Sequence, residues 1–269
     1  MRRISTRASV MSCKGDWSGR DRAKDAARER AWSALEASGA ARDAGGPRGR
    51  IPDFDGAEAA ADWLAATLEW RRAAVVKCNP DPPQAPVRRR ALEDGKTLYV
   101  PVPCLTADMP FLKLAPAALA AAGVPFADAS DAAGAARHGE PVRFDEMEPF
   151  GIAVCGTVAA ARDGGRLGKG GGFADLEMGV FRHFGWMTAA TPVATSVHEA
   201  QVVDALDVAL DAWDVPLDLV ATPGGLVRTG TALPKPRCTV AWDAVRADQL
   251  RDIPFLAALR TQMEEGKPR

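Results

Sequence analysis

The chain concentrates glycine at one point, where the ten residues 166–175 read RLGKGGGFAD. Glycines lack a Cβ atom, so their N–H groups can crowd around an anion, and a helix that starts there adds unpaired donors. Lys169 brings a full positive charge to the same place. The spacing is not that of a Walker A loop, because Gly170 follows the lysine, nor that of G-x-G-x-x-G, because Phe173 stands three residues after Gly170. The stretch therefore predicts a phosphate-binding loop, with a flexible turn as the alternative.

The elements beside this loop follow from the apolar pattern. Residues 151–160 read GIAVCGTVAA, an apolar run typical of a buried strand, and residues 161–172 read as a loop. Beyond the loop, apolar side chains recur at helical spacing and define one buried stripe: Phe173, Leu176, Val180 and Phe184. The sequence thus predicts a strand, a glycine loop and a helix start, in which the positive end of the helix dipole meets the anion.

Helices and strands alternate along the rest of the chain. Apolar spacing predicts three further helices, over residues 21–42, 56–70 and 87–95. Short runs closed by turn residues predict strands over residues 73–80, 97–102, 191–197 and 217–223. This order is typical of an α/β fold, a layered and mostly parallel sheet flanked by helices, in which ligands gather at the carboxyl ends of the strands. Because no repeat or clean linker interrupts it, we predict one domain over residues 21–269.

Two segments are expected at the surface. Residues 128–148 are polar and rich in glycine and alanine, which predicts a surface insertion. The run from Arg88 to Arg90 is expected to form the solvated face of a helix.

Composition limits the class of partner. The 269 residues carry a net charge of about −1, which gives no electrostatic reason to expect nucleic acid or membrane as the main partner, so we expect a small-molecule substrate. No apolar run approaches the roughly 18 residues of a membrane span. The five cysteines are far apart and without paired metal spacing, which favours reduced thiols: Cys13, Cys78, Cys104, Cys155 and Cys238. The sequence does not indicate an oligomeric state.

The first residues differ from the rest. Residues 1–15 contain arginine, lysine, serine and threonine but no acid, a bias seen in organelle transit peptides. We therefore treat residues 1–20 as a disordered leader outside the fold, with a chloroplast or other organelle address. The alternative is a disordered basic tail on a cytoplasmic protein.

The glycine stretch also resembles a known family. RLGKGGGFAD is similar to the nucleotide loop of the 5-formyltetrahydrofolate cyclo-ligase (methenyltetrahydrofolate synthetase) family, whose pattern is close to R-L-G-x-G-x-G-[YF]-[YA]-D. Three further stretches follow in the family's order: Lys24 and Arg28 in K-x-x-x-R spacing, residues 77–96, and DVPLDLVATP at residues 214–223. The likeness covers about residues 22–245. It implies the layered fold of this family, which is related to the NagB, RpiA and CoA-transferase type.

The resemblance also implies a reaction. Family members convert 5-formyltetrahydrofolate and ATP to 5,10-methenyltetrahydrofolate, ADP and phosphate, with Mg²⁺. The formyl group is an amide, whose resonance gives the C–N bond double-bond character and makes the carbonyl a poor electrophile. ATP phosphorylates the formyl oxygen, N10 of the same molecule attacks the carbon, and phosphate leaves. The protein must mainly position and neutralise the γ-phosphate and exclude water.

Site residues are carried over by position. The resemblance implies that ATP is bound by Lys24, Arg28, Arg166, Gly168, Lys169, Gly170, Gly171, Gly172 and Phe173, of which Lys24, Arg28 and Lys169 would be catalytic. It assigns Mg²⁺ to Asp175 and Asp214, and the second substrate to Asn79, Asp81 and Phe173. Read locally, Asp175 is also a favourable acid in the first turn of a helix, and the other two aspartates are also turn residues.

His198 is a separate candidate for substrate binding. It follows the strand predicted over residues 191–197, at the end of the sheet where ligands gather. The alternative is a hydrogen-bonded structural histidine.

The sequence departs from the family pattern at identifiable positions. Ala174 stands where many members have a second aromatic residue, and Asp81 replaces a more usual glutamate, which shortens its reach. Four stretches look more like a paralogous branch found in archaea, animals and plants: IPDF near residue 51, N-P-D-x-P-Q at 79–84, GFADLE, and TSVHEAQVVD at 195–204. In that branch cyclo-ligase activity is not assured and a role in thiamine metabolism has been suggested. The alternatives are thus a paralogue that uses ATP on another substrate, and a nucleotide-binding module without turnover.

Overall fold

The computed structural model describes residues 19–236 and 239–265. The predicted leader, residues 1–20, lies outside the described residues except for Gly19 and Arg20, so its disorder and its address stay predictions. None of the described helices is long and apolar enough to cross a membrane.

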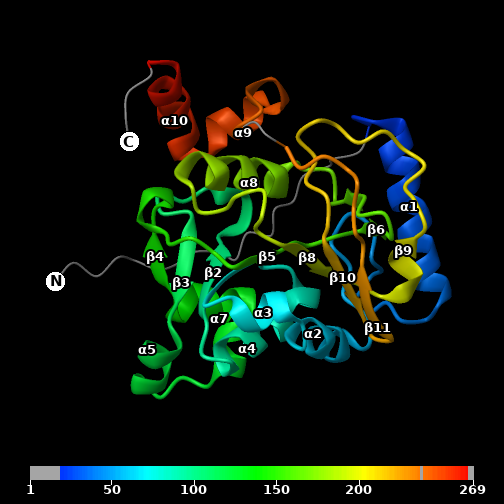
Figure 1. The fold of residues 1–269 in the computed structure, drawn as a ribbon, viewed down its shortest axis with the longest axis horizontal. Coiled ribbons are helices and arrows are strands. Elements are labelled where there is room, and N and C mark those ends of the chain that lie inside the picture. Colours follow the sequence, from blue (N-terminus) through cyan, green and yellow to red (C-terminus); the bar gives the residue numbers. More distant parts are fainter. Residues whose placement is uncertain (1–18, 237–238, 266–269) are drawn as a thin grey trace.

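One large sheet organises the molecule (Figure 1). Its eight strands run in the order β11-β10-β8-β5-β1-β2-β3-β4, and the pairings from β10 through β2 are all parallel. The strands are β1 Val75–Cys78, β2 Thr97–Pro101, β3 Phe111–Leu114, β4 Glu140–Val142, β5 Ile152–Val154, β8 Val193–Ser196, β10 Leu219–Thr222 and β11 Gly225–Arg228. At the centre, Val76 of β1 pairs with Leu98 on one side and Ile152 on the other. The predicted fold class, a mostly parallel sheet flanked by helices, is confirmed.

Helices cover both faces of this sheet (Figure 1). One face carries α2 Ala57–Ala65, α3 Leu68–Arg72, α4 Ala85–Glu93, α5 Pro116–Ala121, α6 Phe126–Ser130 and α7 Ala132–His138. The other carries α8 Phe173–Phe184, α9 Ala247–Asp252 and α10 Pro254–Glu264. Side chains of β1 alternate between the two layers: Val76 and Cys78 belong to the core of the first face, while Val75 packs against the core of the second. Lys77 therefore points toward α8.

A second, three-stranded sheet lies beside helix α1 Arg22–Ala37. It consists of β7 Arg166–Leu167, β6 Ala159–Ala161 and β9 Val202–Val203, and its apolar residues pack against α1. The helix begins at Asp21, whose carboxylate accepts from the N–H groups of Ala23 and Lys24. It ends at residue 37 instead of the predicted 42, ahead of Gly39, which has a φ of +74°.

The strand predicted over residues 151–160 is wrong as a single element. It divides into β5 in the large sheet and β6 in the small one, and the predicted loop contains strand β7. The chain leaves the large sheet at Gly156, where a Cβ atom would lie 2.5 Å from Asp81 Oδ2. Apolar composition is the same on both sides of this point, so periodicity alone does not reveal the break. The helix predicted over residues 56–70 likewise divides, at Thr67, whose side chain caps α3.

The predicted surface insertion over residues 128–148 is also wrong. This segment forms most of α6, then α7, β4 and a 3₁₀ turn, and it buries Ala129, Ala135, Val142 and Phe144. Its small residues allow close packing, since a Cβ atom at Gly134 would lie 1.8 Å from Asp128 O. Glycine and alanine here indicate tight contacts, not solvation.

The expectation of reduced cysteines holds in part. Cys78 and Cys155 are free and buried. Cys104 is disulfide-bonded, which corrects the prediction for this residue; spacing in sequence does not reveal which thiols meet in space. Cys13 and Cys238 lie outside the described residues.

Candidate functional site

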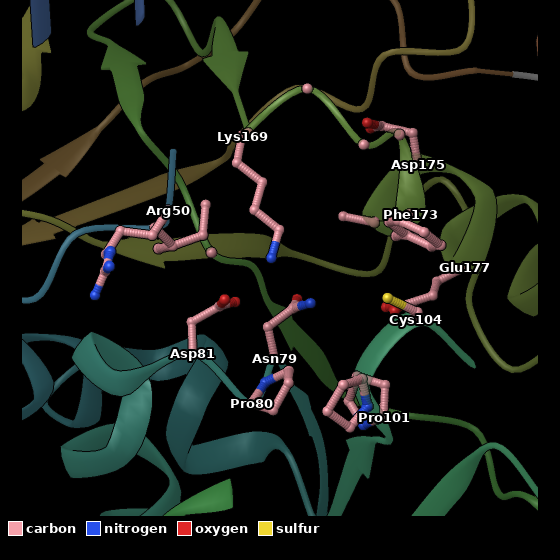
Figure 2. A pocket seen from close by; sticks show the side chains of 18 of the residues that line it. Arg50, Asn79, Pro80, Asp81, Pro101, Cys104, Lys169, Phe173, Asp175 and Glu177 are labelled. Atoms are coloured by element: carbon pink, nitrogen blue, oxygen red, sulfur yellow. The ribbon is translucent and has the colours of Figure 1, made fainter. Parts of the chain in front are cut away.

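A cleft of about 1660 Å³ opens between the glycine loop, α1 and the turn that follows β1. It gathers nearly every residue predicted to bind a ligand: Lys24, Arg28, Asn79, Asp81, Arg166, Gly168, Lys169, Gly170, Gly171, Gly172, Phe173, Asp175 and Asp214. Figure 2 shows the Lys169 side chain reaching from the glycine loop toward Asp81 and Asn79. The structure thus brings the predicted nucleotide residues and the predicted substrate residues to one cavity.

Carbonyl groups of the glycine loop are held by side chains from distant parts of the chain. These contacts join Arg28 Nε to Gly168 O at 2.8 Å, Arg20 Nη1 to Gly170 O at 3.3 Å, and Gln249 Nε2 to Gly171 O at 3.2 Å. Arg20, predicted to belong to the leader, is thus part of the cleft. Side chains from other parts of the chain therefore fix the backbone of the loop, and hydrogen bonds between loop residues do not.

The fixed carbonyls determine where the amide groups point. The chain has no cis peptide bond among its described residues, and in a trans peptide the N–H points opposite to the C=O of the same unit. The N–H groups of Lys169, Gly171 and Gly172 are therefore turned away from the side chains that hold the carbonyls. Between residues 19 and 236 and from 239 to 265, no acceptor takes them. Helix α8 begins at the left-handed Gly172, φ +68°, without a side-chain cap, and so adds first-turn N–H groups that have no partner within the helix.

Cations and carboxylates alternate at one corner of the cleft. Lys24 Nζ lies 2.6 Å from Asp211 Oδ2 and 2.9 Å from Asp214 Oδ2. Burial acts to lower the pKa of Lys24, but its two aspartate partners more than offset this, so the pKa is raised. The ammonium group is therefore charged throughout the neutral range.

Asp175 is the third carboxylate of this corner. Its Oδ1 accepts from Arg166 Nη2 at 2.6 Å and from the N–H of Val215 at 3.1 Å, which brings it next to Asp214. The two predicted metal ligands thus lie together, and each is paired with a cation. Within the part of the chain that the structure describes, no group of three or more His, Cys, Asp or Glu side chains could hold a metal ion.

Asp81 stands at the other end of the cleft. Its Oδ2 packs against Gly156, in space that only a glycine leaves open. Burial raises the pKa of the Asp81 carboxyl, and the positive charges of Lys169 and Arg88 act in the opposite direction. A partly desolvated carboxylate that faces a lysine across a cavity is a typical acceptor for the N–H groups of a ligand.

Arg88 is fully buried, which corrects the prediction of a solvated arginine run. Its guanidinium donates to the carbonyls of Asn79 and Asp81 and, at 2.5 Å, to Ser130 O. Burial lowers the pKa of Arg88, yet arginine stays charged in proteins. Arg88 therefore fixes the backbone of the substrate turn, and only its two neighbours in the run face solvent.

A buried ion pair beneath the cleft was not predicted. Lys77 Nζ lies 2.5 Å from Glu177 Oε2 and 2.8 Å from Asn79 Oδ1, and the two charged side chains are 0% and 3% exposed. Burial acts to lower the pKa of Lys77, but the Glu177 carboxylate outweighs it and the pKa is raised. Because an ammonium group can only donate, it fixes the Asn79 amide with its oxygen toward Lys77 and its NH₂ group away from it. In the sequence, the feature that could have revealed this ion pair is a lysine inside an otherwise apolar strand.

His198 is not among the residues that line the cleft. Its Nδ1 accepts from the N–H of Ala200 at 3.2 Å, and its ring packs edge-on against Phe54 with centroids 6.2 Å apart. His198 thus lies outside the cleft with hydrogen-bond and ring contacts of its own, and its role in substrate binding stays a prediction.

Comparison with known proteins decides the family. The family model described as the 5-formyltetrahydrofolate cyclo-ligase family matches residues 20–223, which is most of the chain. The chain belongs to the 5-formyltetrahydrofolate cyclo-ligase family. The matched range includes the predicted site residues at both ends of the cleft, from Lys24 to Asp214, and it stops before α9 and α10.

Proteins similar to this chain include two from mammals. A methenyltetrahydrofolate synthase domain-containing protein of Mus musculus is 35% identical over 243 residues, which cover 90% of this chain and 64% of the relative. The protein of the same name from Bos taurus is 34% identical over 239 residues, which cover 89% of this chain and 62% of the relative. This chain thus spans less than two thirds of their length. Among solved structures, the Aquifex aeolicus 5,10-methenyltetrahydrofolate synthetase is 18% identical with a TM-score of 0.48, covering 78% of this chain and 95% of that one.

Proposed function

We propose that this chain is an ATP- and Mg²⁺-dependent ligase that closes a ring on a formylated reduced folate, converting 5-formyltetrahydrofolate and ATP to 5,10-methenyltetrahydrofolate, ADP and phosphate. The observation that carries the proposal is the shared cleft: unpaired amides of the glycine loop lie at one end and the Asn79–Asp81 turn at the other. One cavity can therefore hold a triphosphate and an acceptor together, as transfer between them requires.

The donor set at the loop fits a triphosphate. The free N–H groups of Lys169, Gly171 and Gly172 and the uncapped start of α8 would bind phosphate oxygens. Lys24 and Arg28 stand four residues apart on α1 and project from one face into the same cleft. Lys169 adds a long, mobile charge between the two ends.

The carboxylate corner fits a magnesium ion that is held mainly by phosphate. Mg²⁺ commonly takes one or two carboxylates and completes its shell with waters and phosphate oxygens. Asp175 and Asp214 would hold it, and their present partners Arg166 and Lys24 would then be released toward the phosphates. The ion would supply charge neutralisation for the transferred group.

The residues of this chain would act on a formyl group that is an amide, with a rotation barrier of roughly 18–20 kcal/mol and a poor electrophilic carbon. ATP, when bound, supplies the phosphoryl group that turns the formyl oxygen into a leaving group. Lys169 would move its charge to that oxygen, and Asp81 with the Asn79 NH₂ group would hold the ring system. Because the attacking nitrogen belongs to the same molecule, the protein needs no nucleophile of its own.

An assay that follows methenyl absorbance and ADP together tests the proposal. Protein mixed with 5-formyltetrahydrofolate and MgATP should yield both products in equal amounts. Lys169→Ala should lower kcat on the order of 10²-fold or more, because it removes a charge aimed at the reacting group. Lys113→Ala, a lysine outside the cleft paired with Glu148, is the matched control and should leave kcat unchanged. Full activity in the Lys169 variant would refute the phosphate assignment.

A second candidate is the same phosphoryl chemistry on a different acceptor. The Lys77–Glu177 pair favours it, since it places a buried carboxylate at the cleft that the family resemblance did not assign to the site. In that case ADP should appear only with another substrate. If ligands stabilise the fold and no phosphate is released with any acceptor, the chain is a binding module.

A further inference from the structure

The glycine loop is tied to a part of the chain that lies beyond the family match. Arg246 and Gln249, here called the C-terminal clasp, stand at the start of α9, while the matched residues end at 223. Arg246 Nη1 donates to Gly171 O, and Gln249 Nε2 donates to the same oxygen at 3.2 Å. Two donors from one helix start thus converge on one carbonyl of the phosphate loop.

The clasp is itself held in a single geometry. Gln249 is 3% exposed, and its Oε1 accepts from the N–H of Arg246 at 3.1 Å, which leaves its NH₂ group turned toward Gly171. Asp248 binds the guanidinium of Arg246 at two nitrogens, at 2.8 and 2.7 Å. The same guanidinium stands 5.6 Å from the ring centroid of Phe173, the first residue of α8.

The clasp is anchored through α8. Gly179 lets the incoming chain approach, since a Cβ atom there would lie 2.4 Å from Thr239 O. Past the clasp, Ile253, Leu256 and Leu259 are buried in the core of this face. The segment therefore cannot shift along the helix without disturbing packed side chains.

We propose that the C-terminal clasp, Arg246 and Gln249, positions the phosphate-binding amides of the glycine loop. By holding Gly171 O on one side, it turns the N–H of Gly172 to the other, where a phosphate oxygen would meet it. A loop of glycines has no side chains to fix its own peptide planes, so the order must come from outside. The inference rests on the proposed function for its ligand, a nucleoside triphosphate, but the ordering of the loop by the clasp is a property of the protein alone.

Backbone NMR relaxation without ligand tests the ordering. Arg246→Ala and Gln249→Leu should each lower the order parameters S² of the amides of residues 169–172 from the rigid range, about 0.85, toward the flexible range, below about 0.6, whereas Arg251→Ala should not. Arg251 is the matched control, since it lies on the same helix and its guanidinium pairs with Asp252 at the surface. If Arg246→Ala fails to fold, Gln249→Leu carries the test. Unchanged order parameters in folded variants overturn the proposal, whatever the result with nucleotide.

Calorimetry with MgADP and steady-state kinetics test whether the ordered loop binds nucleotide more tightly. Either clasp variant should weaken MgADP binding about tenfold and raise the KM for ATP, because the loop must then be ordered at the moment of binding. The KM for 5-formyltetrahydrofolate should stay within twofold, and Arg246→Lys, which keeps one donor, should recover part of the loss. If the wild-type protein binds no MgADP while the order parameters still fall in the variants, the proposed function fails and the ordering of the loop by the clasp stands. If the order parameters fall and MgADP binding is unaffected, the clasp orders the loop without positioning phosphate, and the proposal is refuted.

Discussion

Lys77 shows how a single residue supports a site it does not enter. It is wholly buried below the cleft, and it holds both Glu177 and Asn79. Removing one member of such a pair leaves a charge without a partner or solvent, which is costly, while removing both leaves a neutral core.

We therefore expect Lys77→Met to destabilise the fold by roughly 3–5 kcal/mol, and the double change Lys77→Met with Glu177→Leu to recover most of that loss. Urea denaturation with ΔG extrapolated to water measures both. If the double variant were no more stable than the single one, the loss would come from the poor fit of the new side chain in the core and not from the unpaired charge of Glu177.

Asp81 should leave a signature in the pH dependence of stability. Its pKa is raised by burial in the folded state, so its contribution to stability is present below the unfolded pKa and is lost as pH rises through the folded pKa. Asp81→Asn should accordingly be more stable than the wild type at neutral pH, and the difference should vanish on acidification below about pH 4. Thermal melts across this range measure it. A variant that is less stable at pH 7 would contradict the assignment.

At the scale of elements, the break between β5 and β6 creates the substrate end of the cleft. It turns the chain out of the large sheet at Gly156 and leaves space for the Asp81 carboxylate. Because Gly156 has no positive φ, its need for glycine comes from this close approach alone.

Gly156→Ala should thus displace Asp81 and raise the KM for the second substrate about tenfold or more, with the KM for ATP little changed. The contrast is Gly95→Ala, where a Cβ would meet nothing within 4 Å and only the φ of +73° is strained. That variant should lose roughly 1–2 kcal/mol of stability with neither KM changed. Kinetics on both variants separate the effect of close approach at Gly156 from the effect of backbone strain at Gly95. Equal changes of KM in the two variants would show that the space at Gly156 does not position Asp81.

The same elements show what the sequence could and could not predict. Parallel strands and the glycine loop were predictable because apolar runs and glycine spacing are local signals. The division of residues 151–160 was not, since the partner that requires it, Asp81, is far away in sequence. Arg88 and Lys77 were misread or missed for the same reason: burial of a charge depends on partners that only the fold supplies. His198 follows the expected strand, yet it turns its ring toward Phe54.

For the whole molecule, the two ends of the cleft should act as one site. MgADP and 5-formyltetrahydrofolate should each raise the melting temperature, since a ligand at 100 times its Kd adds about 2.7 kcal/mol of stability. Together they should add at least the sum of both, because they fill one cavity without sharing contacts. Differential scanning fluorimetry checks this, with ADP in the absence of magnesium as the control. A combined shift barely above the larger single shift would mean that the ligands compete.

The C-terminal clasp also carries a consequence for synthesis. Arg246 follows Gly171 by 75 residues, so the ribosome adds it roughly 4–15 s later at ordinary elongation rates. During that interval α8 and the strands from β8 to β11 are added to the nascent chain, while the peptide planes of the glycine loop are still untied. The proposed ability to hold a nucleotide should therefore arrive only after α9 has emerged, well after the loop itself has been made.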